Sequence, residues 1–464
     1  MQAEKNRTRV QELAAFVANS TYEDLSPRIR DQLKVRILDS FACAFGALNS
    51  AVIHAIRSQL EDFGGNSHCS LIGGGRSAPD RAAFFNGALV RYLDFNDSYL
   101  AKGETCHPSD NLAPVLAAAE YANTSGRDLL TALAIAYQVQ CRLSDVAPVR
   151  DKGFDHTTQG TYAAAAGVSR ALGLDEQKTA NAIAICGASF NALRVTRTGM
   201  LSHWKGLAYP NTAFGCVHAA FLAMRGITGP REVFEGNKGF MEAIAGRFEI
   251  DWSHEGFDRP TKTIVKKYNA EIHAQSAIEA LLELKQEHNF RAADVNEIDV
   301  EVFDVAHKII GGGEEGDKSV VRTKEQADHS LPYVLSVALL DGRVTPEQYR
   351  TERILREDVQ NLLRHVRVHA AEDLSQRFPQ EMPCRVHVRL HSGLLLTKEK
   401  SDYEGFHTRP IGWARIGAKF ARLAESCTSS SQRSEIINAI NELEQVDARR
   451  LMTLLGKSSR RIAA

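Results

Sequence analysis

Apolar residues recur at intervals of three and four along most of the first 265 residues, which is the spacing of a helix with one buried face. The segment 26–48 begins with Ser26 as a cap and Pro27 at the first helical position, and the segment 77–95 repeats this start signal. Further helices are predicted at 126–147, 161–174, 176–190 and 211–226. Many of these segments are rich in alanine on more than one face, which favours helices packed closely on all sides.

The pattern changes near residue 265. Apolar and polar residues alternate at 295–306, at 366–373 and, around a His-Ser-Gly turn, at 384–400, which predicts strands. Helical spacing returns between these strands, at 275–288, 328–342 and 353–366. Strands and helices mixed in this way, with hairpin-type turns, are typical of an α+β domain.

These patterns predict a mainly α fold. We expect a large all-helical domain over residues 1–265 and a smaller α+β domain over residues 266–407, with the helical segment 408–464 completing the first domain. The glycine-rich stretch 311–319 lies inside the second domain. It could cradle a phosphate, but no GK[ST] or GxGxxG motif follows, so a mobile flap is the favoured interpretation.

Composition and charge limit the classes of function. The chain has 464 residues. It contains 56 Lys and Arg residues and 57 Asp and Glu residues, so its net charge is close to zero and does not indicate nucleic-acid binding. No apolar run reaches the length of a membrane span, and the charged N-terminus does not resemble a signal peptide. The eight cysteines are scattered without a CxxC pair or zinc spacing, which indicates reduced thiols in a cytoplasmic protein.

The stretch AKGETCHPSDN, residues 101–111, collects polar groups directly before an apolar helix. Pro108 disfavours helix at His107, so Ser109 or Asp110 can cap the helix that follows. The helix start beside His107 would attract an anion such as a carboxylate. Upstream, Asp94 stands at the end of another predicted helix. Alternatively, Asp110 is only a cap and His107 a surface loop residue.

Four other places put an imidazole or a cation near a predicted helix start. Any one of them alone is more often structural than catalytic. Together they favour a site for an anionic substrate, with groups for acid–base chemistry and no visible set of metal ligands. These groups are His156, His203 with Lys205, the set Lys266, Lys267 and His273, and the pair His329 and Tyr333.

Four segments, in the same order, resemble blocks of the MmgE/PrpD family. They are 91–121, which contains LDFND and HPS, 202–213 (SHWKGLAYPNTA), 266–280 (KKYNAEIHAQSAIEA) and 327–342. The resemblance implies a large helical domain, a smaller α+β lid and a homodimer. It also implies a small polycarboxylate substrate and no metal or organic cofactor.

The resemblance also carries over site positions. We expect catalytic roles for His107, His156, Lys205, Asp94 and Tyr333, and substrate binding by Ser98, Lys266, Lys267 and His273. In the third of these segments the lysine could be Lys266 or Lys267, and Glu271 competes with His273 for the other position. We expect His107 to transfer a proton and to lie within reach of Asp94, His156 and Lys205.

Known activities of the family are 2-methylcitrate dehydratase, cis-aconitate decarboxylase and a dicarboxylate epimerase. Each makes or consumes a carbanion next to a carboxylate, which needs a base near the proton and positive charge on the developing enediolate. The expected activity is a hydro-lyase of the 2-methylcitrate dehydratase type. The alternatives are decarboxylation, epimerisation or, less favoured, binding of carboxylates without catalysis.

Overall fold

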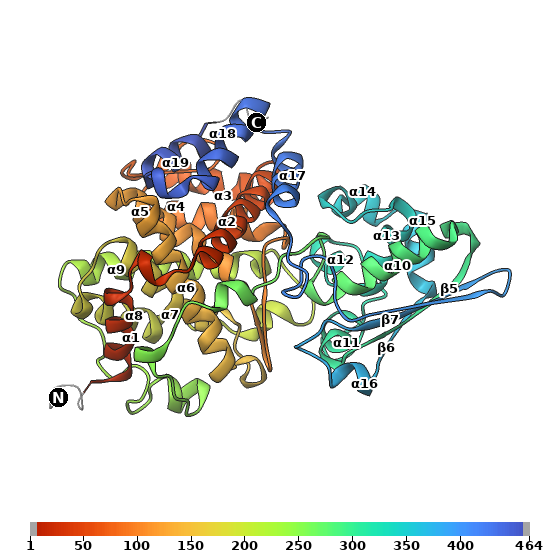
Figure 1. The fold of residues 1–464 in the computed structure, drawn as a ribbon, viewed down its shortest axis with the longest axis horizontal. Helices are drawn as coiled ribbons and strands as arrows, with labels where there is room; N and C mark the ends of the chain where they lie inside the picture. The colour runs from red at the N-terminus through yellow and green to blue at the C-terminus, as the bar shows by residue number, and fades with distance from the viewer. Residues whose placement is uncertain (1–6, 458–464) are drawn as a thin grey trace. The chain divides into compact units, whose positions relative to one another are not determined.

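The computed structural model describes residues 7–457, and these residues divide into two units (Figure 1). Unit 1 comprises the described residues up to Thr196, Gly206–Thr263 and the described residues from Gly412 onward; unit 2 comprises Arg197–Lys205 and Ile264–Ile411. The predicted fold class, mainly α with a smaller α+β part, is confirmed. Residues 1–6 and 458–464, which the sequence assigns to the helical domain, lie outside the described residues.

The helices of unit 1 make up most of its mass. They are α1 (Arg9–Asn19), α2 (Pro27–Ala47), α3 (Ala51–Phe63), α4 (Pro79–Tyr92), α5 (Leu112–Ala122), α6 (Gly126–Val146), α7 (Thr157–Ala171), α8 (Glu176–Ser189), α9 (Trp204–Met224), α17 (Trp413–Ala424), α18 (Ser430–Asn441) and α19 (Ala448–Leu455). The first two residues of α9 fall in unit 2. As predicted, Ser26 caps α2, because its hydroxyl accepts the Ile29 N–H at 3.4 Å, and Pro27 is the first helical residue.

Small side chains let the central helices of unit 1 approach closely. α7 packs on α5, α6 and α8, and its residues Ala163–Ala166 are fully buried. A Cβ atom added at Gly167 would lie 2.8 Å from a methyl group of Val115 on α5 and 2.9 Å from Cβ of Ala136 on α6. Real Cβ atoms do not approach that closely, so Gly167 allows the three helices to pack at their observed distance.

Unit 1 also contains two short hairpins, so the expectation of an all-helical domain is corrected. β1 (Cys69–Ser70) pairs with β2 (Arg76–Ser77), and β3 (Tyr99–Ala101) pairs with β4 (Glu104–Cys106), both antiparallel. Strands of two or three residues are too short to show an alternating pattern in the sequence. The second hairpin ends at Cys106 and therefore fixes the backbone position of the next residue, His107.

Unit 2 is built around a four-stranded sheet in the order β6-β5-β7-β8. The strands are β5 (Val295–Val302), β6 (Val366–Ala370), β7 (Cys384–Leu390) and β8 (Leu395–Lys400). β6 runs parallel to β5, and the other pairs are antiparallel. The alternation predicted for β5 is observed, since Ile298, Val300 and Val302 are all fully buried.

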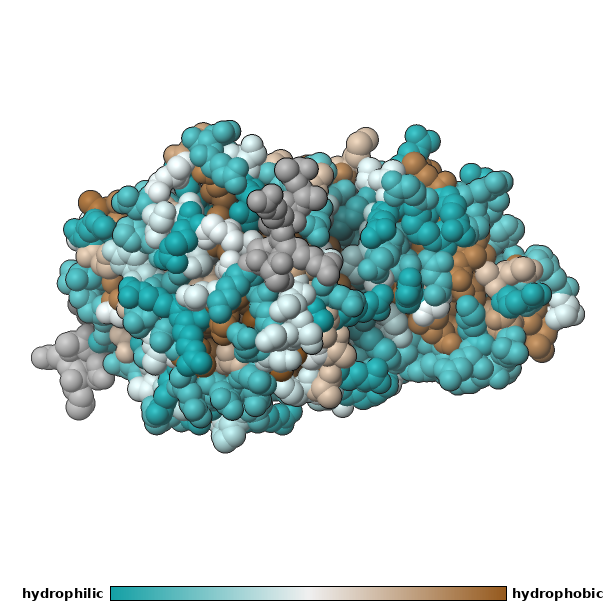
Figure 2. Space-filling view, turned by 90° about the horizontal axis from the view of Figure 1, so that it is seen from above, coloured by the Kyte–Doolittle hydropathy of each residue, from teal (hydrophilic) through white to brown (hydrophobic). Residues whose placement is uncertain are grey.

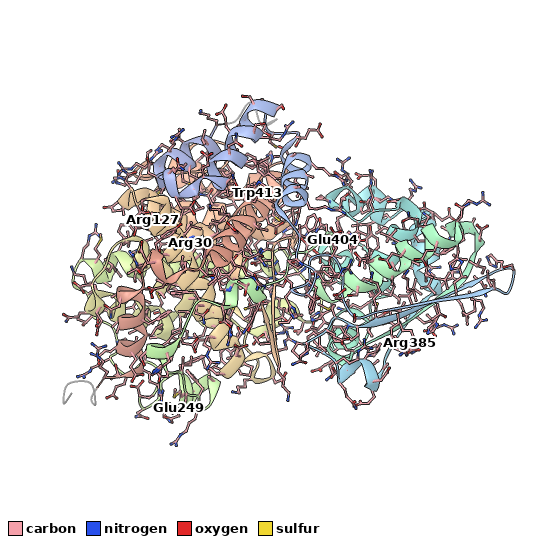
Figure 3. The ribbon with its side chains drawn as sticks, in the orientation of Figure 1. Arg30, Arg127, Glu249, Arg385, Glu404 and Trp413 are labelled. Atoms are coloured by element: carbon pink, nitrogen blue, oxygen red, sulfur yellow. The ribbon has the colours of Figure 1, made fainter. Side chains whose placement is uncertain are left out.

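Helices accompany this sheet in the three segments predicted, 275–288, 328–342 and 353–366, and also at places where none was predicted. They are α10 (Gln275–His288), α11 (Asp304–Ile310), α12 (Lys324–Ala327), α13 (Leu331–Asp341), α14 (Thr351–Ile354), α15 (Glu357–Leu362) and α16 (Glu372–Ser375). α10 packs on β7, β8 and α13. Arg385 of β7, labelled in Figure 3, pairs across the strands with Glu301 and Glu399, so the other side of this sheet is polar.

Hydrophilic residues cover most of the face shown in Figure 2, with small hydrophobic areas between them. Among residues 7–457, no single helix combines the length and the hydropathy needed to cross a membrane. Only α2 and α3 taken together meet that criterion, and they are bent by 87° relative to each other.

Candidate active site

In unit 1, the loop from α4 to α5 carries most of the predicted site residues. Asp94 follows the end of α4 and adopts a left-handed backbone with φ of 53°, which aspartate tolerates better than most residues. The guanidinium of Arg91, one turn earlier, donates to Asp94 Oδ1 at 2.5 Å. Both side chains are buried, so this ion pair fixes the position of the Asp94 carboxylate.

Asp97 holds the two ends of this loop together. Its carboxylate accepts hydrogen bonds from the Ser109 N–H at 3.0 Å, from the Ser109 hydroxyl at 2.6 Å and from the Tyr137 hydroxyl at 2.8 Å. Complete burial raises the pKa of Asp97 to about 6, although the three donors lower it. At neutral pH the carboxylate is therefore ionised and fully hydrogen-bonded.

The prediction that Ser109 or Asp110 caps α5 is wrong. Residues Pro108–Asn111 form a 3-10 turn, and Asn111 is the residue that precedes α5. Ser109 is bound to Asp97, and Asp110 Oδ1 accepts a hydrogen bond from the Asn96 amide at 2.9 Å. The polar side chains that looked like caps are thus used to build the loop on which His107 stands.

His107 is oriented by a backbone carbonyl. Its Nδ1 lies 2.8 Å from the carbonyl oxygen of Asp97 and 3.1 Å from the Ser98 hydroxyl. A carbonyl oxygen can only accept, so Nδ1 carries the proton and the lone pair of the neutral ring lies on Nε2. The predicted residues Ser98 and His107 are therefore in direct contact, and His107 has the tautomer that a base acting through Nε2 requires.

His156 lies beside His107. It is buried at the N-terminus of α7, and the two imidazole centroids are 5.2 Å apart with planes at 72°. Its Nδ1 is 3.3 Å from Asp155 Oδ1, and its Nε2 is 4.0 Å from Asp110 Oδ2. Among residues 7–457, Nε2 of His156 has no hydrogen-bond partner. A buried polar atom without a partner is costly, which marks His156 as a candidate for contact with substrate.

Carboxylates outnumber cations around this histidine pair. Asp94, Asp97, Asp110 and Asp155 are all buried. Arg91 pairs with Asp94 and lies 3.6 Å from Asp110. Burial opposes the charge of Arg91, but these aspartates raise its pKa above the usual value. The site therefore places two adjacent imidazoles, groups that can transfer protons during a reaction, among buried carboxylates.

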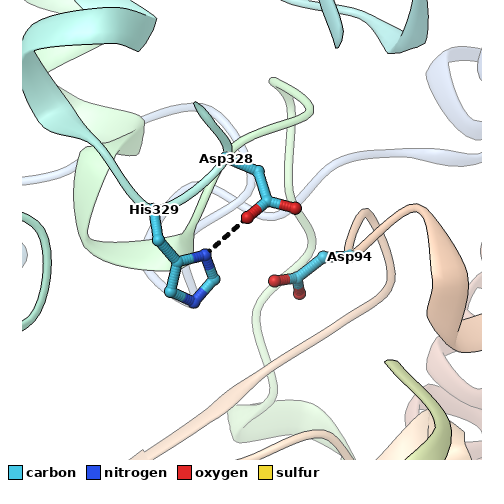
Figure 4. Close-up of side chains that lie close together, drawn as sticks. All are labelled: Asp94, Asp328 and His329. Atoms are coloured by element: carbon cyan, nitrogen blue, oxygen red, sulfur yellow. Dashed lines mark hydrogen bonds and ion pairs between the residues drawn. The ribbon is translucent and has the colours of Figure 1, made fainter. Parts of the chain in front are cut away.

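In unit 2, Lys205 joins a second group of buried charges. Its ammonium group lies 2.7 Å from Asp328 Oδ1 and 2.9 Å from His329 Nδ1. His329 Nδ1 is also 2.7 Å from the same carboxylate oxygen (Figure 4), and Lys324 binds Asp328 Oδ2 at 2.8 Å. Burial alone would raise the pKa of Asp328, but Lys205, Lys324 and His329 hold it well below its usual value.

The structure distinguishes the two neighbouring lysines at 266 and 267. Lys267 binds Glu279 at 2.8 Å and Glu404 at 3.0 Å, and Lys400 joins the same network through Glu279. The Lys266 side chain is instead buried, with 1% of the residue exposed. Lys266 contributes to lowering the pKa of Glu271, so its charge lies near that carboxylate.

Glu271 and His273 also differ in their surroundings. Glu271 accepts from the His273 backbone N–H at 2.7 Å and lies 2.8 Å from His273 Nδ1. The His273 ring is buried with its centroid 5.4 Å from that of Phe303 and 5.8 Å from that of Phe378. Burial opposes ionisation of Glu271, but the charges of His273, His329 and Lys266 lower its pKa to about 2. His273 therefore supports Glu271, which remains charged.

Tyr333, which the resemblance places among the catalytic residues, is buried in α13. Its hydroxyl donates to the backbone carbonyl of Gln348, and burial raises its pKa. A catalytic role would require this hydrogen bond to break, so that role stays a prediction.

Several polar groups near these residues were not selected from the sequence as site residues. They are Arg91, Asp97, Asp110 and Asp328. Two local spacings could have indicated ion pairs: Arg91 and Asp94 are three positions apart, and Lys324 and Asp328 are four apart. A cavity of about 1240 Å³ in unit 1 lies elsewhere, between α1 and residues 249–257.

Comparison with known protein families identifies the family to which this chain belongs. The N-terminal domain of the MmgE/PrpD family matches residues 11–253, and its C-terminal domain matches residues 268–445. The chain belongs to the MmgE/PrpD family. Its relatives include cis-aconitate decarboxylase of Mus musculus, 24% identical over 96% of this chain and 92% of the relative, and that of Homo sapiens, 26% identical over 93% and 91%.

A second activity occurs among the relatives of this MmgE/PrpD protein. The 2-methylcitrate dehydratase of Cupriavidus necator is 30% identical over 71% of this chain and 72% of the relative, and that of Escherichia coli K12 is 29% identical over 58% of each. A decarboxylase and a dehydratase are both lyases. The comparisons therefore support lyase chemistry for this chain at the level of reaction class.

Proposed function

We propose that this protein is a lyase that acts on a small polycarboxylate by moving a proton next to a carboxylate group. The reaction we favour is dehydration of the 2-methylcitrate type. The observation that supports it most directly is the buried pair His107 and His156, in which the Asp97 carbonyl sets the tautomer of His107. An imidazole held in one tautomer among carboxylates is suited to accept a proton near neutral pH.

The chemistry of such a reaction assigns roles to the remaining residues. Removing a proton next to a carboxylate creates an enediolate, which needs positive charge. Lys205 and Lys266 are buried cations of the kind that can bind carboxylates. Loss of water also needs an acid to protonate the leaving hydroxyl, and a histidine that has accepted a proton can supply it.

Decarboxylation of a cis-aconitate-like substrate is the second candidate. The relatives that bear this name align over 91–92% of their own length, more than the 72% found for the dehydratase of Cupriavidus necator. In that reaction carbon dioxide leaves and an acid protonates the remaining carbon. The presence of Asp94, His107, His156 and Lys205 together argues against a binding protein without activity.

We also infer that the protein acts without a metal or organic cofactor, in the cytoplasm, as a homodimer. Exposed apolar side chains that follow α8 in unit 1 support self-association: Leu193 is 58% and Val195 70% exposed. Apolar groups gathered at a surface are typical of protein interfaces. Light scattering of the purified protein tests this, and a mass of a single chain at micromolar concentration would contradict it.

The decisive experiment offers the pure protein 2-methylcitrate, citrate and cis-aconitate separately and follows the products by NMR. Dehydration of 2-methylcitrate should give new alkene signals, whereas decarboxylation of cis-aconitate should give a product with one carbon fewer. Turnover should persist after exhaustive treatment with EDTA. The His107→Ala variant, prepared identically, controls for contaminating enzymes. If none of the three acids changes, the proposed substrate class is wrong, and loss of activity restored by one divalent metal would refute metal independence.

A further inference from the structure

The glycine-rich loop between α11 and α12 is not a phosphate cradle. The N–H groups of Gly311 and Gly313 both donate to the carbonyl of His307, and that of Glu315 donates to the carbonyl of Lys308. The Gly316 N–H is bonded to the Gly313 carbonyl. A phosphate-binding loop needs backbone N–H groups that point at the ligand. Here four of these groups fold the loop back onto itself and α11, so they do not converge on a common anion site.

Lys318, near the end of this loop, is a half-buried cation that forms no ion pair with a carboxylate of the described residues. Among residues 7–457, the partner of its ammonium group is the carbonyl oxygen of Glu315, at 3.2 Å, and no carboxylate forms an ion pair with it. Burial lowers the pKa of Lys318, and the charges of Glu315, Glu271 and Asp328 only partly offset this effect. An ammonium group can donate three hydrogen bonds, so two are available to a ligand.

The backbone of Lys318 is tied to the segment that carries Asp328 and His329. The Ser330 hydroxyl donates to the Lys318 carbonyl oxygen at 2.6 Å, and the same hydroxyl accepts the Tyr333 N–H at the start of α13. A cavity of about 190 Å³ opens beside Lys318, and its lining includes Leu201, Gln326 and the acidic residues Glu315 and Asp317. The loop end is therefore anchored within unit 2, next to a space that a small group can enter.

We propose that Lys318 is a further substrate-binding residue, which holds one carboxylate of the substrate. This inference rests on the proposed function and adds a residue to it. A partly desolvated ammonium group that lacks a counter-ion gains a charge-assisted hydrogen bond when a carboxylate arrives. Phosphate shares the negative charge, but the N–H groups of Gly311, Gly313, Glu315 and Gly316 are already hydrogen-bonded to carbonyl groups.

The test compares Lys318→Met and Lys318→Arg with the control Lys308→Met. Lys308 lies on α11 close to the same loop, but it is exposed and pairs with Asp304 at 3.3 Å. The dissociation constants of citrate and of inorganic phosphate are measured by calorimetry for each protein, with KM and kcat for the substrate identified by NMR. Melting curves establish that each variant is folded, and Lys318→Arg keeps the charge if Lys318→Met unfolds.

Lys318→Met should weaken citrate binding and raise KM by about 10- to 100-fold, the loss expected when a charged hydrogen-bond partner is removed. kcat should change much less, Lys318→Arg should recover part of the affinity, and Lys308→Met should resemble wild type. Unchanged citrate affinity and KM in folded Lys318→Met would overturn the inference while leaving the lyase proposal standing. Selective loss of phosphate binding would overturn the carboxylate assignment. If citrate binding depends on Lys318 but no acid is turned over, the lyase proposal fails and the binding site stands.

Discussion

Both units bury histidines beside carboxylates, but the balance of charge differs. In unit 1, His156 faces Asp110 and Asp155, and Arg91 is the cation paired with the neighbouring carboxylate Asp94. In unit 2, by contrast, the carboxylate of Asp328 is shared by two lysines and His329. Imidazoles are suited to proton transfer, whereas ammonium groups bind anions. We therefore expect the unit 1 residues to transfer protons and those of unit 2 to bind carboxylates.

Replacing His107 should have the largest effect, because it removes a proton-transfer group from unit 1. His107→Ala should lower kcat by about two to four orders of magnitude, because a positioned acid–base group is lost. The melting temperature should hardly change, since Asp97 remains bound to Ser109 and Tyr137. The control is Cys106→Ser, which alters the adjacent buried residue and should keep near wild-type turnover. Steady-state kinetics with near wild-type kcat for His107→Ala would show that this residue only shapes the loop.

Removing the cation from the carboxylate-rich side should affect stability. Arg91→Met leaves Asp94 and Asp110 buried without their cation, so the free energy of unfolding should fall by about 3 to 5 kcal/mol. Arg127→Met, which breaks a pair with exposed Glu23, should cost no more than about 1 kcal/mol. Urea unfolding of both variants measures the difference. Equal losses would mean that Arg91 is not the main support of these carboxylates.

Removing a cation from the lysine-rich side should affect binding more than turnover. Lys205→Ala should raise KM by about 10- to 100-fold with a smaller change in kcat, since Asp328 keeps Lys324 and His329 as partners. Lys267→Ala is the matched control, because Lys267 is already neutralised by Glu279 and Glu404. A larger KM effect for Lys267 than for Lys205 would reverse our choice between these lysines.

The two regions should also differ in how stability depends on pH. The pKa of Asp97 is raised from 3.8 to about 6, so its contribution to stability is lost as pH rises through this interval. The pKa of Glu271 is lowered from 4.5 to about 2, so its contribution is present above 4.5 and lost as pH falls towards 2. The test measures the urea midpoint of unfolding at each pH from 2 to 7. Asp97→Asn should reduce the change of the midpoint between pH 3.8 and about 6, and Glu271→Gln the change between pH 4.5 and about 2. Identical profiles for the two variants would refute this assignment.

Local patterns in the sequence predicted the elements that local forces determine. Ser26 and Pro27 start α2 as expected, and the alternation at 295–306 and 384–400 corresponds to β5 and to the β7–β8 hairpin. The parallel pairing of β6 with β5 could not be predicted, because it joins residues about seventy positions apart and depends on packing. The grouping of Arg197–Lys205 with unit 2 depends on long-range contacts in the same way.

The candidate site was predictable as a set of residue types, but its hydrogen bonds were not. His107 and His156 were selected because each precedes a helix, whereas their contact depends on how α5 and α7 pack. The prediction that Ser109 caps α5 was wrong because the carboxylate of Asp97, twelve positions earlier, accepts hydrogen bonds from both the hydroxyl and the N–H of Ser109. The sequence favoured neither Lys266 nor Lys267, since Glu404, which neutralises Lys267, lies far along the chain.

The discontinuity of unit 1 has a consequence for synthesis on the ribosome. α17, from the end of the chain, packs on α2 near its beginning (Figure 1). Lys419 lies 2.6 Å from the buried carboxylate of Asp39, and Phe420 meets Phe45 edge to face at 5.8 Å. At about 5 to 20 residues per second, the nascent N-terminal helices wait on the order of ten seconds or more for these partners while unit 2 is translated. During that time the surface of α2 that receives α17 lacks its native partner, so unit 1 cannot complete its fold until α17 has been translated.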